Sequence, residues 1–205
     1  IGTQQRDSMF YIILEFADSG SVRQYYQEHG PLTPIQASQC TKQILHGLRY
    51  LHDNGIAHRD IKGANVLLSA TGVVKLGDFG ASKKYEMESL VSGLKGTPHW
   101  MAPEVIKGLQ MTTGWLKADV WSVGCTVVEM CTAALPFACY DNPMTAMYHI
   151  ANGEAPSLGN KIVKTVAMQD NNVSNSNKTD NGTALPDIAT QYQLIQDFVS
   201  ACCHA

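Results

Sequence analysis

The stretch "HRDIKGANVLL", residues 58–68, carries an acid, a cation and an amide within six positions. These are Asp60, Lys62 and Asn65, and a second acid, Asp78, follows in "LGDFG". Transfer of a phosphoryl group demands little covalent chemistry of a protein but much positioning and charge neutralisation. In such a reaction Asp60 would orient the acceptor hydroxyl and accept its proton, and Lys62 would face the transferred phosphate. Asn65 and Asp78 offer the oxygen ligands that Mg²⁺ prefers.

These side chains need a local fold that brings residues 60–65 close to residue 78. The segments "NVLLS" and "VVKLG" are rich in branched apolar residues and flank a short turn at residues 70–72. This pattern predicts a hairpin whose two arms each end beside one part of the group. The hairpin would bring Asn65 and Asp78 into one neighbourhood.

Helices are predicted around this hairpin. Thr33 is a suitable N-cap and Pro34 suits the first helical position, while "DNG" at residues 53–55 ends the helix. The apolar residues that recur on one face of this helix are Cys40, Ile44, Leu48 and Leu51. Further helices are predicted at roughly residues 118–131 and 143–152.

Two apolar segments are predicted to lie in the core. Residues 9–16, "MFYIILEF", are β-branched and aromatic and end at the turn "DSGS", which predicts a buried strand. Residues 120–137 form the most apolar run, which is interrupted by Glu129 and closed by Pro136. We expect a buried core helix there rather than a membrane span.

Composition narrows the class of protein. The 205 residues are 44% hydrophobic with a formal charge of −3, so the chain can bury one core and form up to two lobes. Fifteen basic residues against eighteen acidic ones leave no basic excess for nucleic acid. The six cysteines show no CxxC spacing, and the first residues resemble no secretion signal. We therefore expect a cytoplasmic protein with no nucleic-acid partner and no membrane insertion.

Four motifs resemble eukaryotic serine/threonine protein kinases: "HRDIKGANVLL", "DFGASK", "GTPHWMAPEVI" and "ADVWSVGC". The wording most resembles the MAP kinase kinase kinase group, over about residues 1–156 and weakly after residue 192. Each motif alone would also suit an ordinary turn or helix start, but all four occur in the family's order. The resemblance implies an α+β, protein-kinase-like fold: a mainly helical C-lobe preceded by a remnant of the β-rich N-lobe. It also implies ATP-dependent phosphorylation of serine or threonine on a protein substrate, a MAP kinase kinase.

The resemblance assigns roles to individual residues. It makes Asp60 the catalytic base, Lys62 the phosphate-side cation, and Asn65 with Asp78 the Mg²⁺ ligands. Thr97 would shape the site that receives the substrate residue. The residues assigned to ATP binding at the hinge are Leu14, Glu15, Ala17 and Leu67. The residues assigned to structural support are His58, Arg59, Phe79, Gly80, Glu104 and Asp119.

Residues 83–103 have little periodicity and much Ser, Thr and Gly, which predicts a long surface segment. A phosphate on Ser89 or Ser92 would pair with Arg59, order the segment and seat Asp60. The alternative is that these serines only solvate a loop.

The expected organisation has four parts. Residues 1–17 would end the N-lobe and form the hinge, and residues 18–158 would form the C-lobe with the catalytic loop, activation segment and substrate platform. Residues 159–187 are rich in Asn and are predicted to be a disordered insertion. Residues 188–205 would form a late C-lobe helix that is cut short.

The sequence contains no Gly-rich loop before the hinge, and its first lysine is Lys42, so we expect a chain that starts after the ATP-gripping elements. All four arginines precede residue 60, which leaves Glu104 without the late arginine that pairs with it in the family. The alternative to an active kinase is therefore a truncated lobe that acts as a binding or scaffold module, or a partial gene product. A different nucleotide-binding domain is disfavoured, because neither GxxxxGK[ST] nor GxGxxG occurs.

Overall fold

The computed structural model describes residues 2–84, 96–109, 114–159 and 186–204. The helices are α1 (Val22–His29), α2 (Pro34–Asp53), α3 (Pro103–Ile106), α4 (Gly114–Thr132), α5 (Pro143–Ala151) and α7 (Ile188–His204). The strands are β1 (Gly2–Arg6), β2 (Met9–Ile13), β3 (Ile56–Ala57), β4 (Val66–Leu68), β5 (Val74–Leu76) and β6 (Lys83–Lys84). Single 3-10 turns are η1 (Gly63–Asn65), η2 (Phe79–Ala81) and η3 (Pro98–Trp100). The expected α+β class is confirmed, with more residues in helices than in strands.

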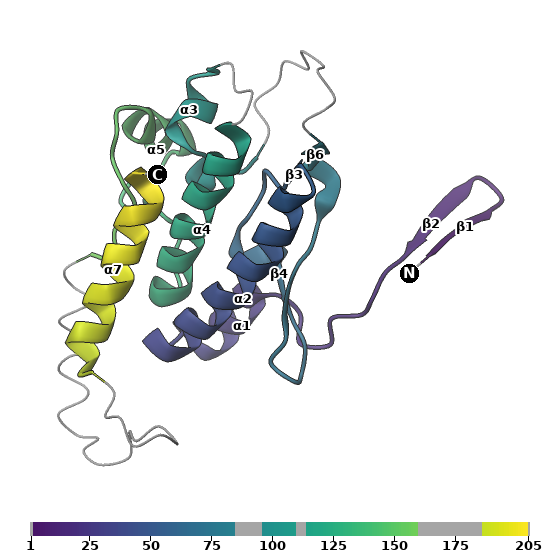
Figure 1. Ribbon diagram of the computed structural model, residues 1–205, viewed down its shortest axis with the longest axis horizontal. Helices are drawn as coiled ribbons and strands as arrows, with labels where there is room; N and C mark the ends of the chain where they lie inside the picture. The colour runs from purple at the N-terminus through teal and green to yellow at the C-terminus, as the bar shows by residue number, and fades with distance from the viewer. Residues whose placement is uncertain (1, 85–95, 110–113, 160–185, 205) are drawn as a thin grey trace.

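Helix α4 lies at the centre of the molecule, between α2 and α7 (Figure 1). Its side chains are buried on nearly every face from Ala118 to Cys131, which explains why the sequence there is apolar without helical periodicity. The expected core helix is therefore confirmed, although it begins at Gly114 rather than near Ala118 and ends at Thr132 rather than continuing to residue 137. Among the helices of the described ranges, none combines the length and hydropathy needed to cross a membrane.

Helix α2 forms where the sequence predicts it. The Thr33 side chain accepts from the Gln36 amide and the Gln36 side chain accepts from the Thr33 amide, which completes a capping box ahead of Pro34. The predicted apolar face is buried: Cys40, Ile44, Leu48 and Leu51 are all at most 7% exposed. This face packs toward α4 and closes the main core.

Helix α1 is absent from the sequence-based expectations. Its eight residues offer only two buried side chains, Val22 and Tyr26, too few to show a helical period. The usable signal was at its start, where Ser21 and Gln24 form a second capping box.

The N-terminal hairpin corrects one expectation. β1 and β2 pair antiparallel, with Gly2 opposite Ile13 and Arg6 opposite Met9. Strand β2 ends at Ile13 rather than Phe16, and all of its residues are exposed. The predicted burial of this strand is therefore wrong. Figure 1 shows the hairpin extending away from the helices, and no second layer among the described residues covers either of its faces.

The predicted hairpin after residue 65 is confirmed. β4 and β5 pair antiparallel from Val66 opposite Leu76 to Leu68 opposite Val74. Beyond the last pair, the Gly77 amide donates to the Asn65 carbonyl at 2.8 Å. The chain therefore delivers Asp78 next to Asn65, as the two arms predict.

The remaining predictions concern the later helices, the Asn-rich segment and the cysteines. The helix expected at residues 143–152 is α5, and the helical pattern after Tyr192 lies within α7. Most of the Asn-rich segment, residues 160–185, lies outside the described residues. All six cysteines are free thiols, and four of them are buried.

Candidate active site

The loop that carries Asp60 is fixed from below by Asp119 on α4. The Asp119 carboxylate accepts from the His58 amide at 2.9 Å and from the Arg59 amide at 2.7 Å, and it contacts His52 Nε2 at 2.9 Å. These bonds hold Arg59 at φ +71°, a left-handed conformation that costs a non-glycine residue free energy. Asp119 is 1% exposed, so it acts as an internal anchor for the loop.

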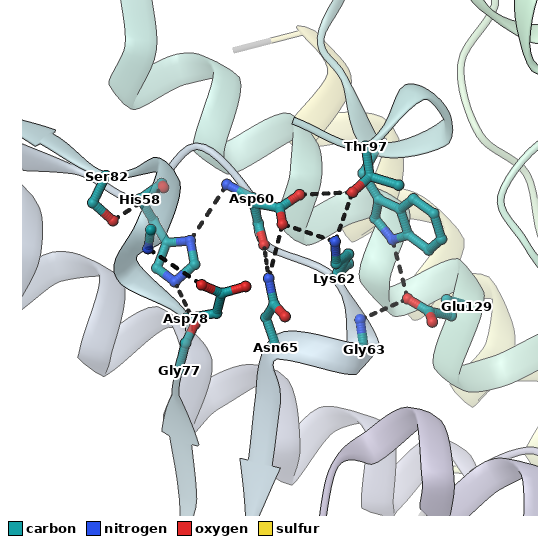
Figure 2. A network of polar contacts seen from close by, with 12 residues as sticks. His58, Asp60, Lys62, Gly63, Asn65, Gly77, Asp78, Ser82, Thr97 and Glu129 are labelled. Carbon is teal, nitrogen blue, oxygen red and sulfur yellow. Dashed lines mark hydrogen bonds and ion pairs between the residues drawn. The ribbon is translucent and has the colours of Figure 1, made fainter. Parts of the chain in front are cut away.

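Asp60, Lys62 and Thr97 form a closed triangle of polar contacts (Figure 2). Lys62 Nζ donates to Asp60 Oδ2 at 2.8 Å and to Thr97 Oγ1 at 2.7 Å, and Thr97 Oγ1 donates to Asp60 Oδ1 at 2.7 Å. The side chains of Asp60 and Lys62 are 14% and 21% exposed. The structure therefore brings Thr97 to the loop that carries Asp60 and Lys62, and it leaves the Asp60 carboxylate partly exposed.

The environment of Asp60 favours its ionised form. Partial burial raises the pKa of the carboxyl, but hydrogen bonds from Lys62, Thr97 and Asn65, together with the positive charge of Lys62, outweigh it and hold the pKa below its usual value. At neutral pH Asp60 is therefore a carboxylate that can accept a proton.

Asn65 and Asp78 lie near each other and could each offer an oxygen ligand to a metal ion (Figure 2). Asn65 Nδ2 donates to the Asp60 carbonyl at 2.8 Å and to Asp60 Oδ2 at 3.0 Å, and within the described ranges no donor bonds to its Oδ1. Asp78 adopts φ +58° and accepts from the Gly80 amide at 3.2 Å. Two oxygens from the chain, with the rest supplied by phosphates and water, suit Mg²⁺. The described residues contain no cluster of three His, Cys, Asp or Glu for an all-protein metal site.

His58 and Phe79 connect the two loops through a contact between their rings, although Phe79 is 50% exposed. The fully buried His58 ring lies 5.2 Å from the Phe79 ring, and its Nε2 contacts the Gly77 carbonyl at 3.0 Å. Ser82 Oγ also donates to the His58 carbonyl at 3.2 Å. The segment carrying Asp78 is therefore tied to the loop carrying Asp60.

The residues assigned to the hinge are only partly brought together. The Gly20 amide donates to the Ala17 carbonyl at 3.3 Å, and Ser21 bridges to Leu67, so the end of the hinge lies against β4. Leu14 is 69% exposed, and the Glu15 side chain pairs with Lys75 at the surface. The described chain thus forms one wall, at Leu67, of the expected adenine site.

Arg59 has an environment that the motifs did not reveal. Its guanidinium lies 4.2 Å from the ring centroid of Trp115, and its buried Nε has no hydrogen-bond partner within the described ranges. Burial lowers the pKa of Arg59, and Asp119 opposes that shift. The proposed phosphorylation sites Ser89 and Ser92 lie outside the described residues.

From the sequence, Glu129 is recognised only as a charged residue that interrupts an apolar run. In the structure it is 1% exposed and accepts three hydrogen bonds, from Tyr26 Oη, the Gly63 amide and Trp100 Nε1. A charged residue inside an otherwise apolar helix was the available signal, because such a group is buried only with partners. Glu104, in contrast, is half-buried with no ion pair among the residues described.

The geometry joins an ionised acid, a lysine and two oxygen donors at one loop, and a family comparison agrees with this arrangement. The sequence model described as "Protein kinase domain" matches residues 1–205. The chain belongs to the protein kinase family. The kinase-like fold expected from the four motifs is thereby confirmed.

Relatives of the chain include mitogen-activated protein kinase kinase kinases. The chain is 45% identical to mitogen-activated protein kinase kinase kinase 1 of Arabidopsis thaliana over 157 residues, which cover 77% of the chain and 25% of that protein. It is 46% identical to mitogen-activated protein kinase kinase kinase 3 of Mus musculus over 160 residues, covering 74% of the chain and 25% of that protein. The chain thus spans about a quarter of these relatives, and the predicted resemblance to this kinase group is confirmed.

Proposed function

We propose that the protein phosphorylates serine or threonine residues of MAP kinase kinases, using ATP and Mg²⁺, within a cytoplasmic signalling cascade. The observation that carries the proposal is the triangle of Asp60, Lys62 and Thr97, because it places a proton acceptor and a cation at one open position. The names of the relatives support the substrate class. The free thiols of the cysteines suit a reducing compartment.

In this proposal the substrate hydroxyl approaches Asp60, which orients the hydroxyl and accepts its proton as the oxygen attacks the γ-phosphorus. The bond between the γ-phosphorus and the bridging oxygen of the β-phosphate breaks in the same step, and ADP is the leaving group. Lys62 faces the transferred phosphoryl group and offsets its negative charge. Thr97 holds Lys62 from the substrate side, so the residue that receives the substrate and the residue that meets the phosphate are positioned together.

Asn65 and Asp78 would hold Mg²⁺, which supplies positive charge to the phosphates when it is bound. The orientation of Asn65 serves this role, because its amide nitrogen is already engaged by Asp60 and its oxygen faces away from that bond. Leu67 would support the adenine from below. A phosphate on Ser89 or Ser92 would pair with Arg59 in the active state.

Phosphate transfer by the full-length protein tests this function. The acceptor is a MAP kinase kinase made inactive at its own catalytic aspartate, with labelled ATP and Mg²⁺. We expect incorporation on serine or threonine, and Asp60→Asn is expected to reduce kcat roughly 100-fold or more. Asp53→Asn is the matched control, since Asp53 is a surface acid with a 68% exposed side chain.

Three results would count against the proposal. Incorporation on tyrosine alone would contradict the assigned amino-acid specificity, and an Asp60→Asn protein as active as Asp53→Asn would contradict the assigned base. Binding of the acceptor protein without any phosphate transfer by the wild-type protein would favour the scaffold alternative.

A further inference from the structure

The buried carboxylate of Glu129 accepts three hydrogen bonds and lies outside the triangle of Asp60, Lys62 and Thr97. It sits near the C-terminal end of α4, and its three donors come from three separate elements. Tyr26 belongs to α1, Gly63 to the catalytic loop, and Trp100 to the turn that follows Thr97. We call this group the Glu129 brace: Glu129 with Tyr26, Gly63 and Trp100.

The two oxygens of the carboxylate have different tasks. Oε2 accepts from the Gly63 amide at 2.8 Å and from Trp100 Nε1 at 3.0 Å, so one atom joins the catalytic loop to the substrate side. Oε1 accepts from Tyr26 Oη at 2.8 Å, its single hydrogen bond to the part of the chain that the structure describes. Figure 2 shows Glu129 to the right of Lys62 and below Thr97, with its bond to the Gly63 amide.

The Glu129 brace closes a ring with the active-site contacts. Gly63 directly follows Lys62, whose Nζ donates to Thr97 Oγ1 at 2.7 Å. The Trp100 amide donates to the Thr97 carbonyl at 2.9 Å, and the Trp100 indole returns to Glu129. The contact between Lys62 and Thr97 is therefore held at both ends by one buried oxygen.

The approach of the loop to Glu129 depends on glycine. A Cβ added at Gly63 would lie 2.7 Å from Glu129 Oε1 and 2.8 Å from its carboxyl carbon, closer than real Cβ contacts allow. Burial raises the pKa of Glu129, and the hydrogen bonds from Gly63, Tyr26 and Trp100 oppose that rise. The Gly63 and Trp100 donors are N–H groups that cannot accept, so Oε2 must remain an acceptor.

We propose that Glu129 is a positioning residue for phosphoryl transfer, which sets the place of Lys62 relative to Thr97 through Gly63 and Trp100. The inference rests on the proposed kinase function. It assigns the Glu129 brace to the geometry of the reaction and not only to the stability of the core. A small displacement at such a site lowers the rate steeply, since reacting groups must be aligned closely.

Variants of the full-length protein test the proposal with two measurements. Trp100→Phe removes the indole donor but keeps an aromatic ring, and Glu129→Ala removes the acceptor. Both are expected to lower kcat for the inactive MAP kinase kinase roughly tenfold or more, with KM for ATP changed by about twofold or less. Glu129→Gln keeps an oxygen for Gly63 and Trp100, and its amide can donate to the Tyr26 hydroxyl oxygen. This variant is expected to restore most of the kcat lost in Glu129→Ala.

Hydrogen exchange of the peptide spanning residues 58–68 gives a readout independent of activity. We expect roughly tenfold faster exchange there in Trp100→Phe, with α2 unchanged. Tyr140→Phe is the matched control, because Tyr140 Oη donates to the Glu154 carboxylate at 2.6 Å outside the site. It should leave kcat and exchange of residues 58–68 as in wild type.

The proposal is overturned if Trp100→Phe keeps both kcat and exchange within about twofold of wild type. Faster exchange spread evenly over α2 and residues 58–68 would overturn it as well, because that pattern marks general destabilisation. If Glu129→Ala does not fold, kcat of Trp100→Phe is compared with kcat of Glu129→Gln. A lower kcat in Trp100→Phe supports the proposal, and equal values overturn it. If the wild-type protein transfers no phosphate, the proposed function fails, while the exchange measurement still decides on the Glu129 brace.

Discussion

Asp60 is surrounded by donors that all favour its charged form. Lys62, Thr97 and Asn65 each donate a hydrogen bond to the carboxylate, and only Lys62 also brings a charge. The net effect is a pKa held below the usual value despite partial burial. Because an unfolded aspartate has a pKa of about 3.9, ionised Asp60 stabilises the fold above that pH. This stabilisation is lost as the pH falls through the lower, folded pKa.

Replacing Lys62 should move the acidic limb of the pH–rate profile. In Lys62→Met the carboxylate loses one hydrogen bond and the nearby positive charge while staying partly buried, so its pKa rises. We expect the acidic limb of kcat/KM to shift to higher pH, together with a lower kcat. The profile is measured between acidic and neutral pH on the full-length protein. Lys107→Met, at an exposed position after α3, is the control, and an identical acidic limb in both variants would contradict the assigned environment.

Two buried carboxylates of α4 contact the loop that carries Asp60. Asp119 lies near the start of this helix and Glu129 near its end, so one rigid element contacts the loop at two points. The loop itself has little regular structure of its own between β3 and β4 apart from η1. Its shape therefore depends on the helix beneath it.

Asp119→Asn should destabilise the protein through this dependence. The amide keeps one oxygen, so either the His58 or the Arg59 amide loses its buried acceptor and faces an NH₂ group. We expect the free energy of unfolding in urea to fall by about 3 kcal/mol, the cost of an unpaired buried donor with a lost charged partner. Asp53→Asn removes only a surface i,i+4 contact with Arg49 and should cost about 0.5 kcal/mol or less. Equal losses in the two variants would refute the anchoring role of Asp119.

Local sequence predicts the elements that local physics specifies. The N-cap and apolar face of α2 and the turn of the β4–β5 hairpin depend on neighbouring residues, and both are as predicted. Exposure of β2 was not predictable, because strand propensity does not reveal whether a second layer covers the strand. The partners of Glu129 were not predictable either, since Tyr26 lies 103 residues away and only the tertiary fold brings them together.

At the scale of the whole molecule, burial is concentrated around α4. One apolar cluster joins α4 to α2 and α7, and a second, which includes Trp100, Trp121 and Ile150, joins it to η3 and α5. Three of the buried cysteines, Cys40, Cys125 and Cys131, lie within these clusters. The reactivity of these buried thiols therefore reports whether the core is closed.

Thiol alkylation should distinguish one cysteine from the others. Cys139 is exposed, whereas burial raises the pKa of Cys40, Cys131 and Cys203 to about 12 and that of Cys202 to about 11. Thiolate is the reactive form, so these groups are protected both by burial and by protonation. Mass spectrometry after a short iodoacetamide pulse at neutral pH should find Cys139 modified first, and Cys139→Ser should remove the fast phase. All six thiols should react in denaturant. Alkylation of Cys40 or Cys131 at the rate of Cys139 in the native protein would show that the α2–α4 core opens readily, contrary to the packing described above.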